Sequence, residues 1–391
     1  MNMSKEPVFA GKCENYDFNK ILSCIESAID SLGGLNTFVK PGQKVLIKPN
    51  MLSCKTPEHA ATTHPEVVKA VATIMVKAGA KVFIGDSPPM VFGKTEEFWQ
   101  KTGYKKAAED SGANLLCFET AAKSDVSLFT NGETKVVHVI KDFFTADLVV
   151  NLPKLKTHNL TRITGAIKNL FGLVPGLQKA QWHKVYTRSK EFSHFITDLA
   201  AKLPARLNIL DAIEGMEGQG PAGGNVIRPG FLLASRSAVA IDRVICAATG
   251  IDENSVEMLK RAAQLNFGPK NLDEIEIMGA SLDEIRISNF VVPGKPVYDR
   301  LPAFLISGLK ALVWAGPKTL KKKCIGCGRC VEICPVNAIK LVEQQAEFQR
   351  QICISCFCCM EVCPVNAIEA QKSPLLAIAF KLRSLKKRLR K

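Results

Sequence analysis

Within residues 1–290, apolar residues occur either in short continuous runs or at helical spacing. The run Val45-Leu46-Ile47 is typical of a buried strand. In residues 65–78, apolar side chains instead recur three or four positions apart, which is the spacing of one helix face. Gly79 ends this stretch, and the apolar run 81–85 indicates a second strand. A strand, a helix and another strand in this order predict a parallel sheet with crossover helices.

The same two patterns predict the other elements of this region. Further strands are predicted over 113–118, 135–140, 147–152, 207–211 and 231–235. Helices are predicted over 17–31, 95–111, 164–171, 190–202 and 237–249. We therefore expect residues 1–290 to form one large α/β domain with a mostly parallel sheet.

The sequence changes in character after residue 290. Residues 291–316 combine a linker containing proline and glycine with a mostly apolar helix predicted over 301–316. That helix is shorter than the roughly 18 apolar residues of a membrane span and contains Lys310, so it favours a docking or interfacial role. Residues 317–370 are expected to form a small α+β module, and residues 371–391 a basic tail.

Two cysteine runs of the form C-x2-C-x2-C-x3-C-P lie in the small module, and both end in the hexapeptide CPVNAI. A run of this kind supplies three thiolates to one iron–sulfur cluster and its fourth cysteine to the other. The first cluster is therefore assigned to Cys324, Cys327, Cys330 and Cys363. The second is assigned to Cys353, Cys356, Cys359 and Cys334. Zinc knuckles and disulfide frameworks usually lack the third cysteine and the C-P pair, so two [4Fe–4S] clusters are predicted.

This module resembles the two-cluster bacterial ferredoxins over about residues 317–370. The resemblance implies a redox protein, and its oxygen-sensitive clusters favour an anaerobic host. One departure is Phe357-Cys358, because such ferredoxins often have a glycine after the second cysteine. Cys358 is a ninth thiol in the module, and it is interpreted either as a packed bystander or as an alternative ligand.

The distribution of charge and of cysteines indicates which binding partners and which cellular compartment to expect. The net charge is +15, but residues 371–391 hold eight basic and no acidic residues, so more than half of the excess belongs to the tail. The tail is a candidate amphipathic helix that can dock on an anionic membrane surface or an acidic partner; the alternative is that it packs on the protein or frays. Cysteines outside the two runs show no pairing pattern, and the N-terminus lacks a signal-peptide core. We therefore expect a cytoplasmic protein with peripheral contact at the inner face of the membrane.

Polar residues follow several predicted strands of the α/β domain. Because ligands of open parallel sheets bind beyond the carboxyl ends of the strands, these residues predict a binding site. The cationic candidates are Lys154, Lys156, His158 and Lys168. With helix N-termini predicted at Thr63 and Thr164, they would form a floor that binds a carboxylate or phosphate. The candidates for acid–base catalysis are His158, His64 and a desolvated lysine such as Lys154 or Lys168.

The sequence does not support three common motifs, which are those for dinucleotide binding, P-loop ATP hydrolysis and radical-SAM chemistry. Residues 218–223 match G-x-G-x-x-G, but no helix is predicted after them, so they are interpreted as a wide loop rather than a dinucleotide site. The sequence contains neither G-x4-G-K-[ST] nor C-x3-C-x2-C. These patterns argue against P-loop ATP hydrolysis and against the usual radical-SAM chemistry.

Six strings occur in order along the α/β domain: VLIKPNML, ATTHPEVV, GDSP, LPKLKTH, TGAIKNLFG and EGMEGQGP. Together they resemble the domain of unknown function 362 family, which is commonly fused to a C-terminal pair of ferredoxin motifs. The resemblance covers roughly residues 5–290 and implies an α/β fold and a shared site, but no reaction. The site residues that it implies are Lys48, Asn50, His64, Asp86, Lys154, Lys156, His158, Lys168, Asn169 and Glu214. Those interpreted as substrate-binding are Lys48, Asn50, Asp86, Lys156, Asn169 and Glu214.

The combined features favour an iron–sulfur electron-transfer protein. Its clusters are expected to relay electrons between an external carrier, such as ferredoxin or flavodoxin, and a site that reduces a small anionic substrate. An alternative is an electron carrier or redox sensor without chemistry of its own, docking an acidic partner or a membrane surface. Nucleic-acid binding with structural clusters is a weaker alternative, because the basic face of the tail lacks interleaved aromatic residues.

Overall fold

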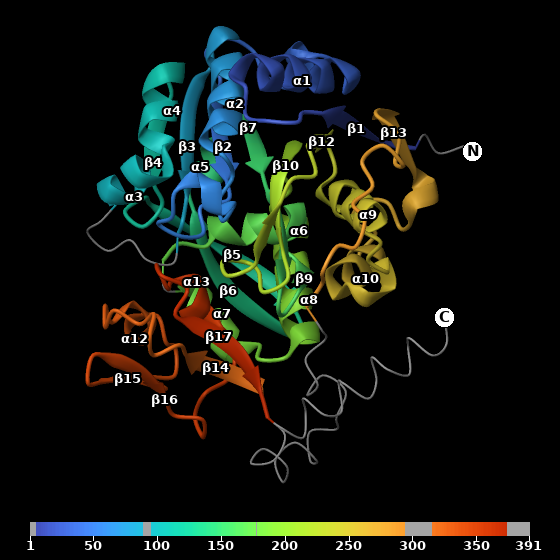
Figure 1. Ribbon diagram of the computed structural model, residues 1–391. Helices are drawn as coiled ribbons and strands as arrows, with labels where there is room; N and C mark the ends of the chain where they lie inside the picture. The colour runs from blue at the N-terminus through green and yellow to red at the C-terminus, as the bar shows by residue number, and fades with distance from the viewer. Residues whose placement is uncertain (1–4, 89–94, 177, 294–314, 374–391) are drawn as a thin grey trace.

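The computed structural model describes residues 5–88, 95–176, 178–293 and 315–373, which form a large α/β domain and a small module (Figure 1). The large domain contains an 11-stranded sheet. Its main path runs, in spatial order, through β13 (Ile275–Gly279), β1 (Glu6–Lys12), β12 (Phe231–Ser235), β10 (Leu207–Glu217), β7 (Leu148–Leu152), β2 (Lys44–Pro49), β3 (Lys81–Asp86) and β4 (Asn114–Cys117). Neighbours from β10 to β4 are parallel, whereas β12 is antiparallel to β1 and β10. The predicted α/β fold with a mostly parallel sheet is confirmed.

Helices cover both faces of this sheet (Figure 1). One face packs against α1 (Phe18–Ser31), α2 (Pro65–Lys77), α3 (Thr95–Thr102) and α4 (Tyr104–Ser111). The other packs against α6 (Gly165–Asn169), α8 (Ser189–Lys202), α9 (Ala238–Thr249) and α10 (Glu257–Gln264). In β2, Val45 and Ile47 belong to the first core and Leu46 to the second, as expected for a strand buried on both sides.

Several smaller elements complete the large domain. The strands outside the main path are the hairpin β5 (Lys123–Thr130) and β6 (Glu133–Ile140), and β8 (Lys154–His158), β9 (Arg162–Ile163) and β11 (Asn225–Ile227). The remaining α-helices are α5 (Asp142–Thr145) and α7 (Gln178–Val185). The 3-10 helices are η1 (Leu35–Thr37), η2 (Pro57–His59), η3 (Leu170–Leu173), η4 (Glu253–Ser255) and η5 (Leu272–Glu274). Residues 218–223 connect β10 to β11 without a helix, as the sequence predicts for a wide loop.

Two segments predicted as loops are paired strands. The strand predicted over 207–211 continues to Glu217, and Lys154–His158 forms β8 instead of a loop after β7. The reason is their mutual pairing, in which Lys154 lies opposite Asp211 and Lys156 opposite Met216. Polar residues in these strands are tolerated because their side chains find partners across the pairing.

Three helix boundaries also differ from the prediction. The helix predicted over 95–111 is split at Gly103, which adopts the left-handed conformation (φ 81). The helix predicted over 164–171 is α6 followed by η3. The cap of α2 is His64, whose Nδ1 accepts the Glu66 amide, because the Thr63 hydroxyl is engaged by the carbonyl of Leu152.

The small module contains two short hairpin-like sheets and two helical turns. Its strands are β14 (Ala315–Thr319) paired with β17 (Ile368–Lys372) and β15 (Ile339–Val342) paired with β16 (Gln345–Phe348). Its helices are α12 (Arg329–Glu332) and α13 (Cys358–Glu361). The α+β module predicted after the large domain is therefore confirmed. Most of the apolar helix predicted over 301–316 and of the basic tail lies outside the described residues.

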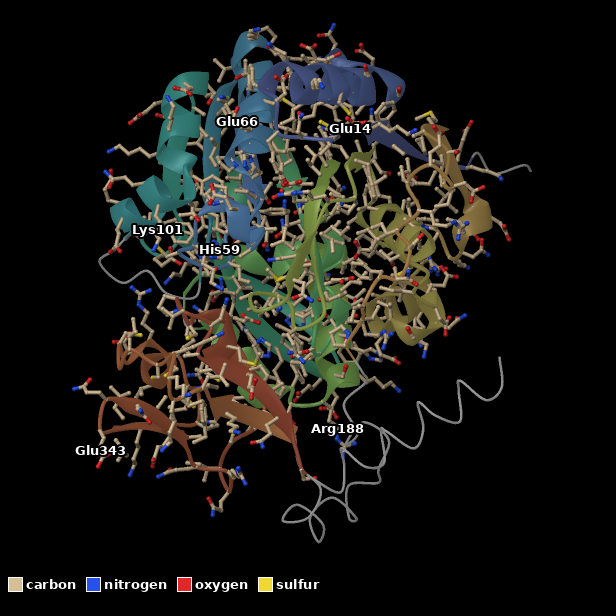
Figure 2. The ribbon with its side chains drawn as sticks, in the orientation of Figure 1. Glu14, His59, Glu66, Lys101, Arg188 and Glu343 are labelled. Atoms are coloured by element: carbon tan, nitrogen blue, oxygen red, sulfur yellow. The ribbon has the colours of Figure 1, made fainter. Side chains whose placement is uncertain are left out.

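Side chains fill the space between the ribbons, and charged residues such as Glu14, Lys101 and Glu343 project outward (Figure 2). The small module lies below the carboxyl ends of the parallel strands in Figure 1. This placement brings the cysteine-rich segment to the sheet edge at which the sequence predicts a binding site.

Candidate functional site

The carboxyl ends of β2 and β3 place Lys48 and Asp86 side by side. Their Nζ and Oδ1 atoms are 3.0 Å apart, and both side chains are buried. Burial lowers the pKa of Lys48 to about 8, although the Asp86 charge opposes this shift. Gly172 closes over the pair, since a side-chain carbon there would come within 2.1 Å of an Asp86 oxygen. The pair is therefore sealed from one side by a position that requires glycine.

Amide side chains connect this pair to the neighbouring strands. Asn50 donates through Nδ2 to Asn169 Oδ1 at 3.0 Å, and its own Oδ1 accepts from Lys156 Nζ at 2.6 Å. Lys156 donates a second hydrogen bond to the carbonyl of Ala61 at 2.7 Å. Asn169 donates to Asn151 Oδ1 at 2.8 Å. Lys156 is therefore a buried structural donor that positions Asn50.

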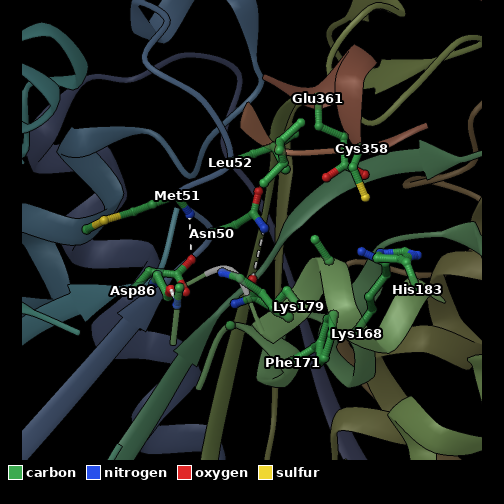
Figure 3. A pocket seen from close by; sticks show the side chains of 16 residues that line it. Asn50, Met51, Leu52, Asp86, Lys168, Phe171, Lys179, His183, Cys358 and Glu361 are labelled. Carbon is green, nitrogen blue, oxygen red and sulfur yellow. Dashed lines mark hydrogen bonds between the residues drawn. The ribbon is translucent and has the colours of Figure 1, made fainter. Parts of the chain in front are cut away.

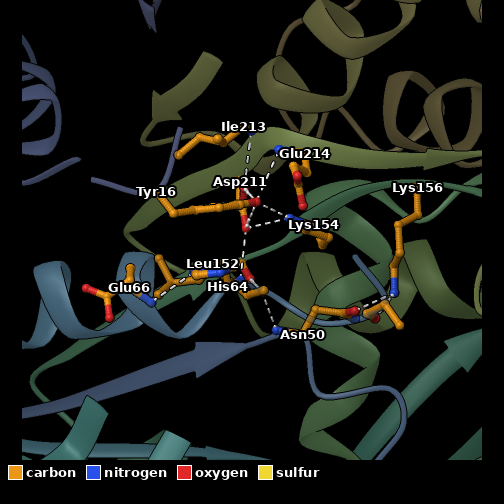
Figure 4. A network of polar contacts seen from close by, with 12 residues as sticks. Tyr16, Asn50, His64, Glu66, Leu152, Lys154, Lys156, Asp211, Ile213 and Glu214 are labelled. Atoms are coloured by element: carbon orange, nitrogen blue, oxygen red, sulfur yellow. Dashed lines mark hydrogen bonds and ion pairs between the residues drawn. The ribbon is translucent and has the colours of Figure 1, made fainter. Parts of the chain in front are cut away.

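Lys154 and Asp211 form a second buried ion pair across β8 and β10 (Figure 4). Their Nζ and Oδ2 atoms are 2.8 Å apart, and the side chains are 1% and 0% exposed. The Tyr16 hydroxyl accepts from Lys154 at 2.6 Å and donates to Asp211 at 3.0 Å, and the ring of His64 stacks on Tyr16 with centroids 3.5 Å apart. The ion pair thus has partners on every side and presents no free ammonium group.

The two helix N-termini predicted to bind an anion are occupied by side chains of the protein. Asp211 accepts the backbone N–H of His64 at the start of α2, at 2.9 Å. Asp242 accepts the N–H groups of Ala166 and Ile167 at the start of α6. Protein carboxylates therefore already satisfy the amides that a substrate oxyanion was expected to use.

A cavity lies between the α/β domain and the small module (Figure 3). From the α/β side it is lined by the ends of β2 and β3, by α6 and by α7, which contribute Lys168, Lys179 and His183. From the small module it is lined by Ile333, Cys358 and Glu361. Segments at least 150 residues apart in sequence (His183 to Ile333) therefore form the opposite walls of one cavity.

The structure divides the residues predicted from the sequence into separate groups. Those that line the cavity are Asn50, Asp86, Lys168 and Asn169. Lys48 and Lys156 lie behind the cavity, bonded to Asp86 and Asn50. The others lie elsewhere: Lys154 and His64 in the Tyr16 network, and Glu214 beside it on β10, paired with Arg228.

Three lining residues with a charged or imidazole side chain were not predicted: Lys179, His183 and Glu361. Lys179 and His183 are four residues apart in α7, so the spacing places them on one helix face once that helix is known. No periodicity around α7 predicts the helix, and Glu361 is indistinguishable from an ordinary surface carboxylate within its cysteine run. A sequence pattern alone gives no reason to combine these residues.

His158 connects the α/β domain to the small module through Glu361. Its Nδ1 accepts the backbone N–H groups of Leu160 and Thr161 at 3.1 and 3.3 Å, so the proton lies on Nε2. Nε2 is 3.5 Å from Glu361 Oε1, a long electrostatic contact rather than a full hydrogen bond. Burial lowers the pKa of His158 to about 4. Burial raises the pKa of Glu361, but the His158 contact and the Lys168 charge outweigh it and lower that pKa to about 2.

Two further contacts join the module to the large domain. Lys55 Nζ donates to Asn366 Oδ1 at 2.5 Å and to the Ala222 carbonyl at 2.7 Å. Ala180 of α7 packs in an apolar cluster with Ile333, Cys358 and Val362 of the module. Both polar and apolar contacts therefore hold the module against the sheet edge.

The eight cysteines of the two runs surround two cavities within the small module. One is lined by the set Cys324, Cys327, Cys330 and Cys363. The other is lined by the set Cys353, Cys356, Cys359 and Cys334. Each set combines three cysteines of one run with the fourth of the other, as in the sequence assignment. Among the described residues, no three His, Cys, Asp or Glu side chains converge on a site for a single metal ion.

The duplicated hexapeptide CPVNAI folds the same way in both runs. Asn337 and Asn366 adopt left-handed conformations (φ 53 and 50) that turn the chain. The turn directs the N–H of Ala338 at Cys334 Sγ (3.2 Å) and that of Ala367 at Cys363 Sγ (3.1 Å). Such N–H donors stabilise thiolate ligands, so these residues fit [4Fe–4S] clusters.

The departure at Phe357 keeps the same loop geometry as the first run. Gly328 follows the second cysteine of the first run with φ 76, and Phe357 occupies the matching position with φ 62. A bulky residue in this conformation is strained. Its ring packs with Cys359 and Met360 in the core of the module, which offsets that strain.

Comparison with known proteins places this architecture in a family. Residues 45–247, just over half of the 391 residues, match the model described as "Domain of unknown function (DUF362)". A thylakoid-associated protein of Synechocystis is 32% identical over 303 residues, which cover 76% of this chain and 92% of that protein. The chain belongs to the DUF362 family.

The second module of this DUF362 protein also has a known counterpart. Residues 323–367 match the model of a 4Fe-4S dicluster domain, so the chain carries a ferredoxin-type [4Fe–4S] domain that supports iron–sulfur electron transfer. A solved structure, the lactate racemase apoprotein from Thermoanaerobacterium thermosaccharolyticum, aligns with a TM-score of 0.38 and 11% identity over 60% of this chain. The aligned part spans 54% of that racemase chain.

The DUF362 match contains every α/β residue of the cavity, including Lys179 and His183, whereas Glu361 and Cys358 belong to the dicluster match. The cavity is therefore a shared feature of the two matched segments. Within the described ranges, no helix is long and apolar enough to cross a membrane.

Proposed function

We propose that this DUF362 protein is an electron-transfer protein in which two [4Fe–4S] clusters relay single electrons between a partner protein and the cavity at the sheet edge. The observation that carries the proposal is the position of Cys358, which lines both the cavity of the second cysteine set and the cavity that holds Lys168 and Lys179. A single side chain thus separates the second cluster site from the α/β site. When bound, the clusters supply one-electron chemistry.

The two cysteine sets differ in their surroundings, which supports a direction for the path. Cys327 of the first set is exposed, and Ile325 in the same loop is 62% exposed. Cys356 of the second set packs in one apolar cluster with Cys358 and with Ala180 of α7 in the α/β domain. In the proposed path the first set therefore faces a partner in solution, and the second faces the cavity.

A basic segment beside the first set supports an acidic redox partner such as ferredoxin or flavodoxin. Lys321, Lys322 and Lys323 are exposed and immediately precede Cys324. Charges of this kind accelerate association with a protein of opposite charge and orient it. The exposed apolar side chain of Ile325 supplies the desolvated contact at the centre of such a surface.

Anaerobic purification with iron, sulfide and metal analysis tests the cluster assignment. Two clusters predict about eight irons per chain and interacting EPR signals after reduction. Bound zinc, or a single cluster in fully loaded protein, would overturn the assignment. The reduced protein is then mixed with small carboxylates and phosphates, and reoxidation is followed in the visible spectrum. A compound that reoxidises it faster than the buffer control identifies the electron acceptor.

The second candidate is a carrier or sensor without chemistry of its own. The exposed apolar and basic surroundings of the first set favour it, because a docking surface is all that a carrier needs. In that case an acidic ferredoxin exchanges electrons with the protein, but no small compound reoxidises it. Lys168→Met would then leave all electron transfer unchanged.

Peripheral membrane contact is a further part of the proposal. The Synechocystis relative is named for its association with thylakoids, and the basic residues of 371–391 suit an anionic lipid surface. Binding to vesicles with and without anionic lipid tests this point.

A further inference from the structure

We infer that the cavity between the two modules is a binding site for a small oxyanion, a carboxylate or phosphate group, held by Lys168, Lys179 and His183. The inference rests on the proposed function only for the oxyanion's role as electron acceptor. The binding itself follows from the groups that line the cavity. Of the three residues, only Lys168 is a candidate from the sequence.

The first argument is the state of the two lysines. Lys168 and Lys179 are partly buried and line the same cavity, and within the part of the chain that the structure describes neither ammonium group has an ion-pair or hydrogen-bond partner. Burial lowers the pKa of each, and the Lys168 charge lowers that of Lys179 further, although Asp86 and Glu361 oppose these shifts. An anion between the two ammonium groups would relieve both effects.

The second argument is an independent one, from His183. Its ring is held between Phe192, at 4.1 Å between centroids, and the edge of Phe171. Its Nδ1 is buried and has no hydrogen-bond partner among the described residues. An unpartnered buried nitrogen is unfavourable, so a ligand oxygen at this position would satisfy it. Burial lowers the pKa of His183 to about 3, so the ring is neutral and offers one N–H donor.

Asp86 and Glu361 raise the pKa of both lysines and so oppose the effect of burial, but each carboxylate also has partners of its own. Asp86 is paired with Lys48 and also accepts the backbone N–H of Met51 and of Ser87. Glu361 lies on the opposite wall, in contact with His158. Glu119, farther back, accepts from the Ser87 hydroxyl. A bound oxyanion is thus attracted to the α6 and α7 wall and repelled from the Glu361 wall, which fixes its orientation.

The size of the cavity limits the ligand. It leaves about 70 Å³ for the centres of water-sized molecules. Since one buried water needs roughly 10–15 Å³ of such space, the cavity admits a group on the order of five heavy atoms. Inorganic phosphate and oxalate are of this size, whereas a nucleotide is not.

The test measures anion binding to the oxidised, cluster-loaded, full-length protein without an electron donor. Inorganic phosphate and oxalate are titrated separately by calorimetry. Lys168→Met and Lys179→Met are each expected to weaken binding about tenfold or more, because each removes a charge-assisted hydrogen bond. Lys184→Met is the matched control. Lys184 lies in α7, like Lys179, but it is exposed and does not line the cavity. This variant is expected to change the affinity less than twofold.

Further variants keep the test independent of folding. Lys168→Arg retains the charge and should retain binding, and His183→Phe should weaken binding several-fold. Iron content and circular dichroism must match the unaltered protein in every case. Tighter binding of phosphate identifies a phosphate-bearing ligand, and tighter binding of oxalate a carboxylate.

Two results would overturn the inference. One is the absence of binding of both anions at several millimolar; the other is equal weakening by Lys184→Met and Lys168→Met. Failure of the proposed function has a different signature. Anions that bind with the expected variant pattern but never reoxidise the reduced protein leave the site standing and remove the electron-acceptor role. A compound that reoxidises the protein without sensitivity to Lys168 or Lys179 removes the site and leaves electron transfer standing.

Discussion

Lys154 provides the sharpest test of whether a lysine at this edge is structural or catalytic. The sequence makes it a catalytic candidate, but the structure buries it in an ion pair with Asp211 at 2.8 Å. We therefore predict that Lys154→Met and Asp211→Asn lower the stability of the α/β domain strongly. Removing one member of a buried pair typically costs about 3–5 kcal/mol, because the other charge stays buried.

The contacts around the pair indicate which change costs more. After Lys154→Met, Asp211 still accepts from the Tyr16 hydroxyl and from the backbone amides of His64 and Ile213, so the cost is expected near the lower end, about 3 kcal/mol. After Asp211→Asn, Lys154 keeps only the Tyr16 oxygen as a partner, and residue 211 no longer carries the negative charge that accepts the two backbone amides. The loss of stability is therefore expected to be about 5 kcal/mol. For a domain of about 290 residues these values correspond to a decrease of roughly 5–8 °C in Tm.

The assay is denaturant unfolding under anaerobic conditions, with circular dichroism for the α/β domain and visible absorbance for the clusters. A double variant should lose at least about 1 kcal/mol less than the sum of the single variants, because the two residues are coupled. Lys12→Met is the control: the Lys12–Glu284 pair is exposed and screened by solvent, so breaking it should leave the stability almost unchanged. Normal stability of Lys154→Met combined with lost electron transfer to a small acceptor would refute the reasoning and return Lys154 to the catalytic candidates.

Three other predictions concern acid stability, Cys358 and the tail. The free energy of unfolding should fall as pH drops from 6.5 towards 4, by about 3 kcal/mol for His158 alone, because the unfolded chain takes up a proton that the buried ring (pKa about 4) takes up only at lower pH. His158→Asn keeps an acceptor for the backbone N–H groups of Leu160 and Thr161 and should make the free energy of unfolding less dependent on pH. An unchanged pH dependence in this variant would contradict the prediction. Cys358→Ala should keep about eight irons but slow reoxidation by a cavity ligand, whereas Cys359→Ala should lower the iron content; equal iron loss in both would make Cys358 a ligand. Deleting residues 374–391 should abolish sedimentation with anionic vesicles and leave the iron content unchanged; retained sedimentation would place the membrane contact elsewhere.

The features that the sequence predicts well are those determined by local spacing. The two cysteine runs constrain a tight loop and a turn, so the pattern alone predicts two ligand sets, and the structure places the cysteines of each set around one cavity. The crossover α2 between β2 and β3 is local in the same sense. Hydrophobic spacing specifies each of these three elements, and the parallel arrangement of the two strands follows from their order along the chain.

The features that the sequence misses depend on pairing between distant segments. Lys154 appears to follow a strand, yet it lies within β8 because β8 pairs with the extension of β10 around Asp211. His64 follows Thr63, the better capping residue by type, but Thr63 is already bonded to the carbonyl of Leu152 on β7. The cavity itself exists only because Glu361 of the small module meets α7. None of these contacts leaves a periodic trace in the sequence.

The lysines at the sheet edge differ in what they can still bind. Three lysines are almost completely buried, and each has hydrogen-bond partners of its own. Lys48 contacts the Pro49 carbonyl and Asp86, and Lys154 contacts Tyr16 and Asp211. Lys156 contacts Asn50 and the Ala61 carbonyl. An ammonium group can be buried only when such partners replace its water, so these three are committed to the fold. Lys168 and Lys179 have no such partners among the described residues and keep part of their surface accessible. The physical cost of burying a charge therefore separates structural lysines from those that remain free for a ligand, and it favours the proposed anion site beside Cys358 over one at Lys154.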